Sequence, residues 1–93
     1  MATTATRPRE RTLAEILPPY NVILLNDDVH PMDYVVIALL RSVPALTLDR
    51  AAELMAEAHT TGQAVVITCP LEPAELYRDR IQTYGLGALV ERA

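Results

Sequence analysis

Polar side chains interrupt apolar sequence at one point of the chain, in the stretch LLNDDVHPMDYVV at residues 24–36. Asn26, Asp27 and Asp28 stand together there, and His30 precedes Pro31. Amide and carboxylate oxygens accept hydrogen bonds, and an ionised carboxylate attracts cations. Such a set therefore suits either a divalent metal ion or an ammonium group. A turn in which Asx side chains bond the nearby backbone explains the same residues without any ligand.

A metal or phosphoryl site is the first alternative, because two carboxylates after a strand can hold Mg²⁺. The chain has no lysine and no glycine-rich phosphate loop to accompany such a site. Its two histidines and single Cys69 lack the spacing of zinc ligands. We therefore expect no metal and no cofactor. A small regulatory domain that binds a divalent metal through the Asp pair stays open as an alternative.

A free α-amino group is the second candidate ligand. It is an ammonium with three N–H donors, so it needs three convergent acceptors and favours a negative one. Asn26 supplies an amide oxygen and Asp27 a carboxylate. A neutral His59 supplies the third acceptor if the helix end that carries it lies beside the end of the first strand. That placement is consistent with two helices that bury apolar faces on one sheet.

Hydrophobic periodicity predicts the elements that position these groups. Strands are expected at residues 20–26, 64–69 and 86–91, and helices at 31–43, 47–62 and 73–84. The order βααβαβ predicts an α+β fold, in which a three-stranded antiparallel sheet packs against three helices as a two-layer sandwich. Pro31 suits a first helical position, Thr47 an N-cap, and Gly62 a left-handed C-terminal position. Gly85 ends the last helix.

Each predicted helix carries one apolar face. The expected faces are Met32, Val35, Val36, Leu39, Leu40 and Val43 on the first helix; Leu48, Ala51, Met55, Ala58 and His59 on the second; and Ala74, Tyr77, Ile81 and Tyr84 on the third. These faces meet the strands in a single core.

Composition narrows the class of protein. Ninety-three residues, 51% of them apolar, make one small domain. We expect a mobile N-terminal extension at residues 1–19 and a folded core at residues 20–93. A net charge of −4 with scattered arginines predicts no nucleic-acid partner. The apolar runs are too short to span a bilayer, so no membrane partner is expected. A cytoplasmic monomer is predicted, and the plastid stroma is the other possible compartment.

Three stretches together resemble the ClpS family of N-degron adaptors: YNVILLNDDVHPMDYVV, AAELMAEAHTTGQAVV and AELY…YGLGALVE. The likeness covers residues 20–91. It implies an adaptor that is not an enzyme and has no catalytic residue. This adaptor recognises substrates with a bulky hydrophobic first residue, namely Leu, Phe, Tyr or Trp. It also implies delivery of these N-degron substrates to the N-terminal domain of a ClpA- or ClpC-type AAA+ unfoldase, for degradation by ClpP.

The resemblance also assigns residues. It implies that Asn26, Asp27 and His59 bind the α-amino group. The implied pocket for the first side chain consists of Asp28, His30, Met32, Val35, Met55, Ala58 and Leu86. Glu72 and Glu75 match the family's unfoldase-docking region, although Tyr77 stands where a lysine is often found.

Two pocket positions depart from the family pattern. Ala58 replaces a frequent valine, and His30 replaces a frequent threonine. A general peptide-binding domain, whose apolar groove takes internal segments, is the remaining alternative.

Overall fold

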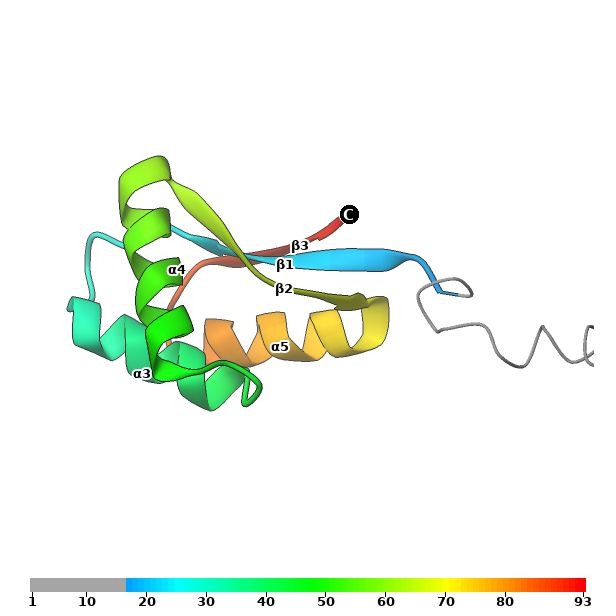
Figure 1. Cartoon of the computed structure of the whole chain (residues 1–93), viewed down its shortest axis with the longest axis horizontal. Helices are drawn as coiled ribbons and strands as arrows, with labels where there is room; N and C mark the ends of the chain where they lie inside the picture. Colours follow the sequence, from blue (N-terminus) through cyan, green and yellow to red (C-terminus); the bar gives the residue numbers. More distant parts are fainter. Residues whose placement is uncertain (1–16) are drawn as a thin grey trace, which may run out of the picture.

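The computed structural model describes residues 17–93. Within that range the elements follow the order β1, α3, α4, β2, α5 and β3 (Figure 1). Their bounds are β1 Pro19–Leu25, α3 Met32–Ser42, α4 Leu48–Thr61, β2 Gln63–Pro70, α5 Leu71–Thr83 and β3 Ala88–Arg92. The predicted order βααβαβ is confirmed. Residues 1–16 of the predicted extension lie outside the described residues, and Pro19, at its predicted end, is already the first residue of β1.

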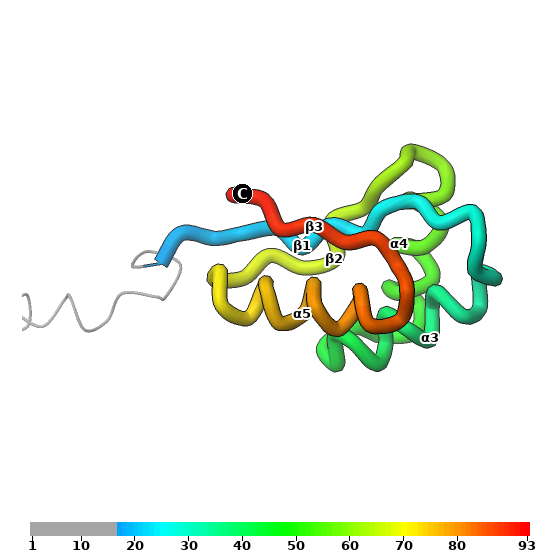
Figure 2. The backbone as a smooth tube through the Cα atoms, turned by 180° about the vertical axis from the view of Figure 1, so that it is seen from behind, coloured from blue at the N-terminus to red at the C-terminus, as the bar shows by residue number. Residues whose placement is uncertain are grey.

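The three strands form one antiparallel sheet with the order β2-β1-β3. β1 lies in the middle, where Leu24 is paired with Ala64 of β2 and with Ala88 of β3. The register shifts between Val22 and Ile23, as a β-bulge does. Because β1 is bonded along both edges, its end is a fixed point for whatever follows it. Figure 2 shows this central position from the opposite side.

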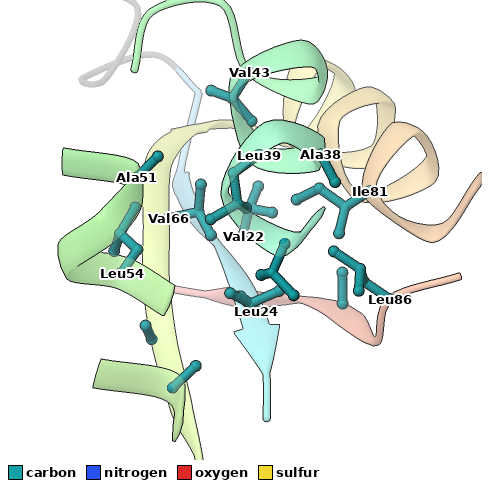
Figure 3. Close-up of a cluster of buried hydrophobic side chains, with 14 of the residues drawn as sticks. Val22, Leu24, Ala38, Leu39, Val43, Ala51, Leu54, Val66, Ile81 and Leu86 are labelled. Carbon is teal, nitrogen blue, oxygen red and sulfur yellow. The ribbon is translucent and has the colours of Figure 1, made fainter. Parts of the chain in front are cut away.

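The three helices lie on one side of the sheet, so the predicted two-layer α+β sandwich is confirmed (Figure 1). Val22 and Leu24 of β1 point into the core between the layers (Figure 3). The fully buried partners from the helices include Leu39, Leu54 and Ile81. Since β1, α3, α4 and α5 each contribute to the same cluster, the described residues share one hydrophobic core.

The buried face of α4 differs from the predicted one. Leu48 is 63% exposed, whereas Leu54, absent from the predicted stripe, is fully buried together with Ala51 and Ala58. With 3.6 residues per turn, Leu48 lies about 90° around the helix from the centre of that face. The prediction for Leu48 is therefore wrong. Met55 is half-buried beside that face, and His59 is exposed.

Local end signals fall where the sequence predicts them. The Thr47 hydroxyl accepts a hydrogen bond from the Arg50 N–H (3.1 Å), as an N-cap does. Gly62 has φ 99° and Gly85 has φ 82°, the left-handed conformation that favours glycine. Pro31 is the N-cap of α3 rather than its first helical residue, and α5 begins at Leu71, so that Pro73 lies in its first turn. Among residues 17–93, no helix is long and apolar enough to cross a bilayer.

Ser42 is a polar residue inside the core. It is fully buried near the end of α3, and within the described part of the chain its Oγ has no hydrogen-bond partner. An unpaired buried hydroxyl has lost its hydrogen bonds to water without replacement. Ser42 therefore destabilises the folded chain.

We expect Ser42→Ala to raise the free energy of unfolding by about 1 kcal/mol, because alanine removes the unpaired hydroxyl and little volume. Urea denaturation followed by circular dichroism measures this change. Thr60→Ala is the control, because the exposed Thr60 hydroxyl donates to the Ala56 carbonyl (2.9 Å) on its own helix. A loss of stability in Ser42→Ala would contradict the assignment.

Candidate functional site

The end of β1 is held from both sides by backbone hydrogen bonds. The Leu25 N–H donates to the Gly87 carbonyl (3.0 Å), and the Asn26 N–H donates to the Gly62 carbonyl (2.9 Å). Gly62 is the C-cap of α4 and follows His59 by three residues. Asn26 is thereby placed beside the last turn of α4. This contact brings the end of β1 and the end of α4 together, as a shared site for Asn26 and His59 requires.

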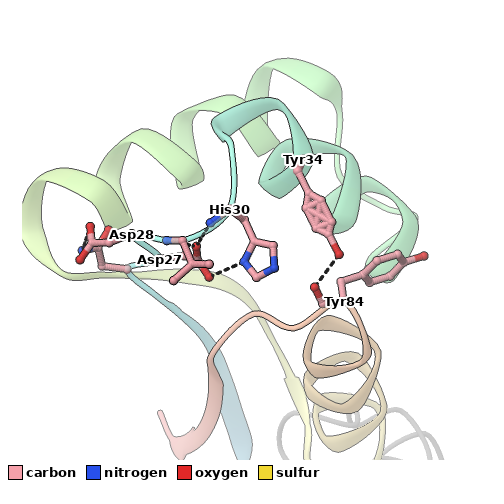
Figure 4. Close-up of polar contacts among 7 residues, drawn as sticks. Asp27, Asp28, His30, Tyr34 and Tyr84 are labelled. Carbon is pink, nitrogen blue, oxygen red and sulfur yellow. Dashed lines mark hydrogen bonds and ion pairs between the residues drawn. The ribbon is translucent and has the colours of Figure 1, made fainter.

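Asp27 closes the turn that leads from β1 to α3. Its Oδ1 accepts hydrogen bonds from the backbone N–H groups of Val29 (2.9 Å) and His30 (2.6 Å). Its Oδ2 accepts a third from Nδ1 of the His30 ring (2.9 Å), and Figure 4 shows this pair. A carboxylate can only accept, so the His30 proton lies on Nδ1. Asp27 therefore fixes both the loop backbone and the orientation of the histidine.

These contacts lower the pKa of the Asp27 carboxyl below its ordinary value of 3.8. The hydrogen bond from the His30 backbone N–H is the main cause, desolvation opposes it, and the His30 ring and the Val29 N–H add to it. Asp27 is thus held as a carboxylate, and it carries a negative charge at the pocket.

Asp28 has a different environment. It is exposed, and its Oδ1 accepts a hydrogen bond from the side-chain Nδ2 of Asn26 (3.1 Å). That bond uses the donor end of the Asn26 amide and leaves its carbonyl oxygen as the accepting end. Asp28 is therefore a positioning residue for Asn26. The sequence contains no signal for this pairing beyond the spacing of two residues.

Besides Asp27, two residues contact the His30 ring, namely Tyr34 and Gly85. It stacks on the Tyr34 ring, with centroids 4.7 Å apart and planes inclined by 14°. The Tyr34 hydroxyl donates to the Tyr84 backbone carbonyl (2.6 Å), which ties α3 to the end of α5. A Cβ atom placed on Gly85 would lie 3.3 Å from the His30 ring, so the ring packs directly on that glycine. Figure 4 shows His30 above the turn that joins α5 to β3.

A hollow opens between the end of β1, the start of α3 and the last turns of α4. It is lined by Leu24, Leu25, Asn26, Asp27, His30, Met32, Val35, Met55, Ala58 and His59. It encloses about 280 Å³ of space without atoms, part of it open solvent.

The hollow brings together the three predicted acceptors, Asn26, Asp27 and His59, with most of the predicted apolar wall. Asp28 and Leu86 are predicted at the pocket, but neither lines it. The Asp28 side chain turns to the Asn26 amide, and Leu86 is 3% exposed within the core, on the far side of the Gly85 turn. Leu24 and Leu25 also line the hollow, although the sequence did not predict this. Their apolar pattern predicted only that they belong to a buried strand.

Glu72 and Glu75 lie elsewhere, near the start of α5 and beside Tyr20 of β1, whereas the hollow lies at the other end of β1. Figure 1 shows that α5 begins far from the start of α3. They border an open groove that Leu17, Pro18, Tyr20, Pro70, Leu71 and Pro73 complete. The predicted docking residues therefore share one surface, separate from the acceptor cluster. Within residues 17–93, no three His, Cys, Asp or Glu side chains gather as a metal site requires.

Comparison with known proteins defines the class. Residues 15–88 match the family model described as "ATP-dependent Clp protease adaptor protein ClpS". That is a class of adaptors of a protease, and the family's name denotes no enzymatic activity of its own. The chain belongs to the ClpS family.

Individual relatives agree with the family match. The chain is 46% identical to the ClpS adapter of Synechococcus elongatus, over 95% of this chain and 93% of that protein. It is 42% identical to the chloroplastic adapter CLPS1 of Arabidopsis thaliana, over 87% of this chain and 51% of that protein. The structure of Agrobacterium tumefaciens ClpS2 bound to L-phenylalaninamide superposes with a TM-score of 0.77 at 29% identity, covering 82% of this chain and 98% of the other.

The Asp27 contacts predict how stability depends on pH. A pKa that is lower in the folded chain than in the unfolded chain adds stability above the unfolded value, and this contribution is lost as the pH falls through the folded value. We expect Asp27→Asn to be less stable than the parent at pH 7, and the difference to shrink progressively below pH 3.8. Urea denaturation across this pH range measures the difference.

Asp79→Asn is the matched control, because the Asp79 side chain is 61% exposed and, among residues 17–93, its ion pair is with its neighbour Arg78. It should change stability little at any pH. A stability difference for Asp27→Asn that stays constant from pH 7 to pH 2 would contradict the role given to this carboxylate.

Proposed function

We propose that this adaptor recognises proteins by a free α-amino group and a bulky hydrophobic first side chain. The observation that carries the proposal is one hollow in which Asn26, Asp27 and His59 adjoin the apolar side chains of Met32, Val35, Met55 and Ala58. The lining thus combines hydrogen-bond acceptors with apolar groups. An N-terminal residue has the same division, an ammonium on one side and a side chain on the other.

The acceptors suit an ammonium in number and in charge. Asn26 offers its amide oxygen because Asp28 bonds its NH₂ group. Asp27 supplies the negative charge, and a neutral His59 ring supplies a nitrogen lone pair. Charge-assisted hydrogen bonds of this kind are stronger than neutral ones, so the amino group contributes much of the specificity.

The apolar wall supplies the rest of the affinity. Burial of a Leu or Phe side chain stabilises a complex by roughly 1.5–3 kcal/mol. Methionine is flexible and polarisable, and so Met32 and Met55 can adapt to a ligand. The related ClpS2 bound to L-phenylalaninamide supports this assignment, since that ligand combines a free α-amino group with an apolar side chain.

Fluorescence anisotropy with matched peptides tests the proposal. The peptides differ only in residue one, Leu, Phe, Val or Ala, and each is made with a free and with an acetylated amine. We expect tight binding only for a free amine and a bulky first residue, and His59→Ala or Asp27→Ala to weaken it by about 2–5 kcal/mol where a buried ammonium loses its partner.

Glu53→Ala, on the exposed side of α4, serves as the control that should bind like the parent. Binding that survives acetylation would favour a groove for internal peptide segments. Binding of Mg²⁺ that Asp27→Ala or Asp28→Ala abolishes would favour the metal-dependent regulatory domain instead.

The groove at Glu72 and Glu75 is proposed to dock the N-terminal domain of a ClpA- or ClpC-type unfoldase. Two carboxylates beside exposed Leu71 (41%) combine charge with an apolar contact.

We expect Glu72→Arg with Glu75→Arg to weaken binding of that domain by at least about tenfold, or 1.4 kcal/mol. Calorimetry with the isolated domain measures it. Peptide affinity should not change, because the groove lies away from the hollow; a parallel loss of peptide binding would show misfolding instead.

A further inference from the structure

The outer side of α3 carries a stripe of side chains that the proposed function does not use. Asp33, Ile37 and Arg41 follow one another at four-residue intervals, so they lie along one side of the helix, and all three are exposed. Ile37 is 48% exposed although it is apolar. Met32 and Val35, which line the hollow, lie about 140° or more around the helix from Ile37. The stripe therefore belongs to a separate surface.

A groove runs beside this stripe. It is lined by Asp33, Tyr34, Ile37, Ala38, Arg41 and Tyr84, and it encloses about 650 Å³ of space without atoms, part of it open solvent. Four of these residues, at positions i, i+3, i+4 and i+7 of α3, surround a hole of the kind that receives one side chain of a facing helix. Ala38 is buried at its floor, and its small side chain lets a larger one approach the helix closely.

The two tyrosines hold one wall of the groove in place. The Tyr34 hydroxyl donates to the Tyr84 carbonyl (2.6 Å), and the two rings meet edge to face with centroids 6.5 Å apart (Figure 4). The other face of the Tyr34 environment is the stacked His30 ring. A wall that is already ordered lowers the entropy cost of binding a partner there.

The charges of the stripe are arranged symmetrically about its apolar centre. Asp33 and Arg41 each lie four residues from Ile37, about 6 Å along the helix axis. Two α3 helices that pack antiparallel about a two-fold axis at Ile37 place the Asp33 of each copy beside the Arg41 of the other. Within residues 17–93 the ion pairs are formed by other side chains. The stripe is thus complementary to itself.

The two charges also have a local role, which does not explain the isoleucine. Asp33 lies in the first turn of α3 and Arg41 in the last, where each suits the helix dipole. The dipole requires neither an exposed apolar side chain between them nor a groove beside it. A facing copy of the same helix accounts for all of these features.

We propose that two copies of this chain pair through the outer sides of antiparallel α3 helices, with Ile37 at the two-fold axis and Asp33 of each copy facing Arg41 of the other. Such a contact is closed, so association stops at a dimer. One pair of eleven-residue helices makes a small interface, and the dimer is therefore reversible.

This inference departs from the monomer expected from the sequence, because Ile37 belongs to none of the predicted apolar faces. It goes beyond the proposed function and does not rest on it. The groove beside the stripe shares no lining residue with the hollow or with the groove at Glu72 and Glu75.

Sedimentation equilibrium of the full chain, at concentrations up to about 1 mM, tests the pairing. We expect the average mass to rise from 10.3 kDa toward twice that value and not beyond it. Ile37→Asp places two like charges opposite each other at the axis and should raise the dimer dissociation constant at least about tenfold. Leu76→Asp is the matched control, because Leu76 on α5 is also 48% exposed but does not line the groove.

Charge reversal identifies the second copy as the partner. Asp33→Arg alone and Arg41→Asp alone bring like charges together, so each variant should dimerise at least about tenfold more weakly. An equimolar mixture of these two variants restores both ion pairs in the mixed dimer, and the double variant Asp33→Arg/Arg41→Asp restores them between identical copies. We expect the dimer to return in both cases.

Thermal melts of each variant exclude loss of the fold as the cause of a change. A parent chain that stays at 10.3 kDa throughout would overturn the inference. A dimer that Ile37→Asp leaves intact, or a mixture of the two charge variants that stays monomeric, would do the same. A mass that grows beyond the dimer would show an open-ended contact and would likewise contradict a two-fold pairing.

Discussion

The site depends on the backbone hydrogen bond from the Asn26 N–H to the Gly62 carbonyl. It joins two segments that are thirty-odd residues apart in the chain, the end of the central strand and the C-cap of α4. The carbonyl is available there because Gly62 takes the left-handed conformation that ends the helix. On the other edge, the Leu25 N–H is bonded to Gly87. The loop that carries the acceptors therefore starts from a point fixed on both sides.

The two neighbouring aspartates have distinct structural roles. Asp27 accepts three hydrogen bonds from its own loop, so its charge is held in place before any ligand arrives. Asp28 faces outward and orients the Asn26 amide. Adjacent side chains on a tight turn point in different directions, which is why two identical residues can divide these tasks. An oriented acceptor set lowers the entropy that a ligand must remove on binding.

Much of the fold follows from periodic and local signals. The order of elements, the Thr47 cap and the left-handed Gly62 are written in short stretches of sequence, and the structure contains all of them. The rotation of α4 was not predictable in the same way. Leu48 and Leu54 are equally apolar, and only the position of the helix on the sheet decides which of them is buried. Small residues such as Ser42 give no apolar signal at all, although tight packing places them in the core.

The site was predictable where chemistry required particular residue types, and not where contacts cross the chain. An ammonium needs three acceptors, and Asn26, Asp27 and His59, which the sequence offers as candidates, line one hollow. The bond from the Tyr34 hydroxyl to the Tyr84 carbonyl joins α3 to the end of α5, fifty residues further along the chain, and no local pattern encodes it. Leu86 was assigned to the pocket because the family pattern places it there. In this chain Leu86 is buried in the core and is not among the residues that line the hollow.

The two proposed binding surfaces lie at opposite ends of the same strand. β1 has seven residues and therefore spans about 23 Å. Asn26 follows its last residue, whereas Tyr20 near its start lines the groove that contains Glu72 and Glu75. A strand bonded on both edges is stiff, so we expect that a ligand bound at one end of β1 does not displace the other end. The geometry thus favours an adaptor that can hold a ligand and a docking partner at the same time, as two independent contacts on one rigid sheet.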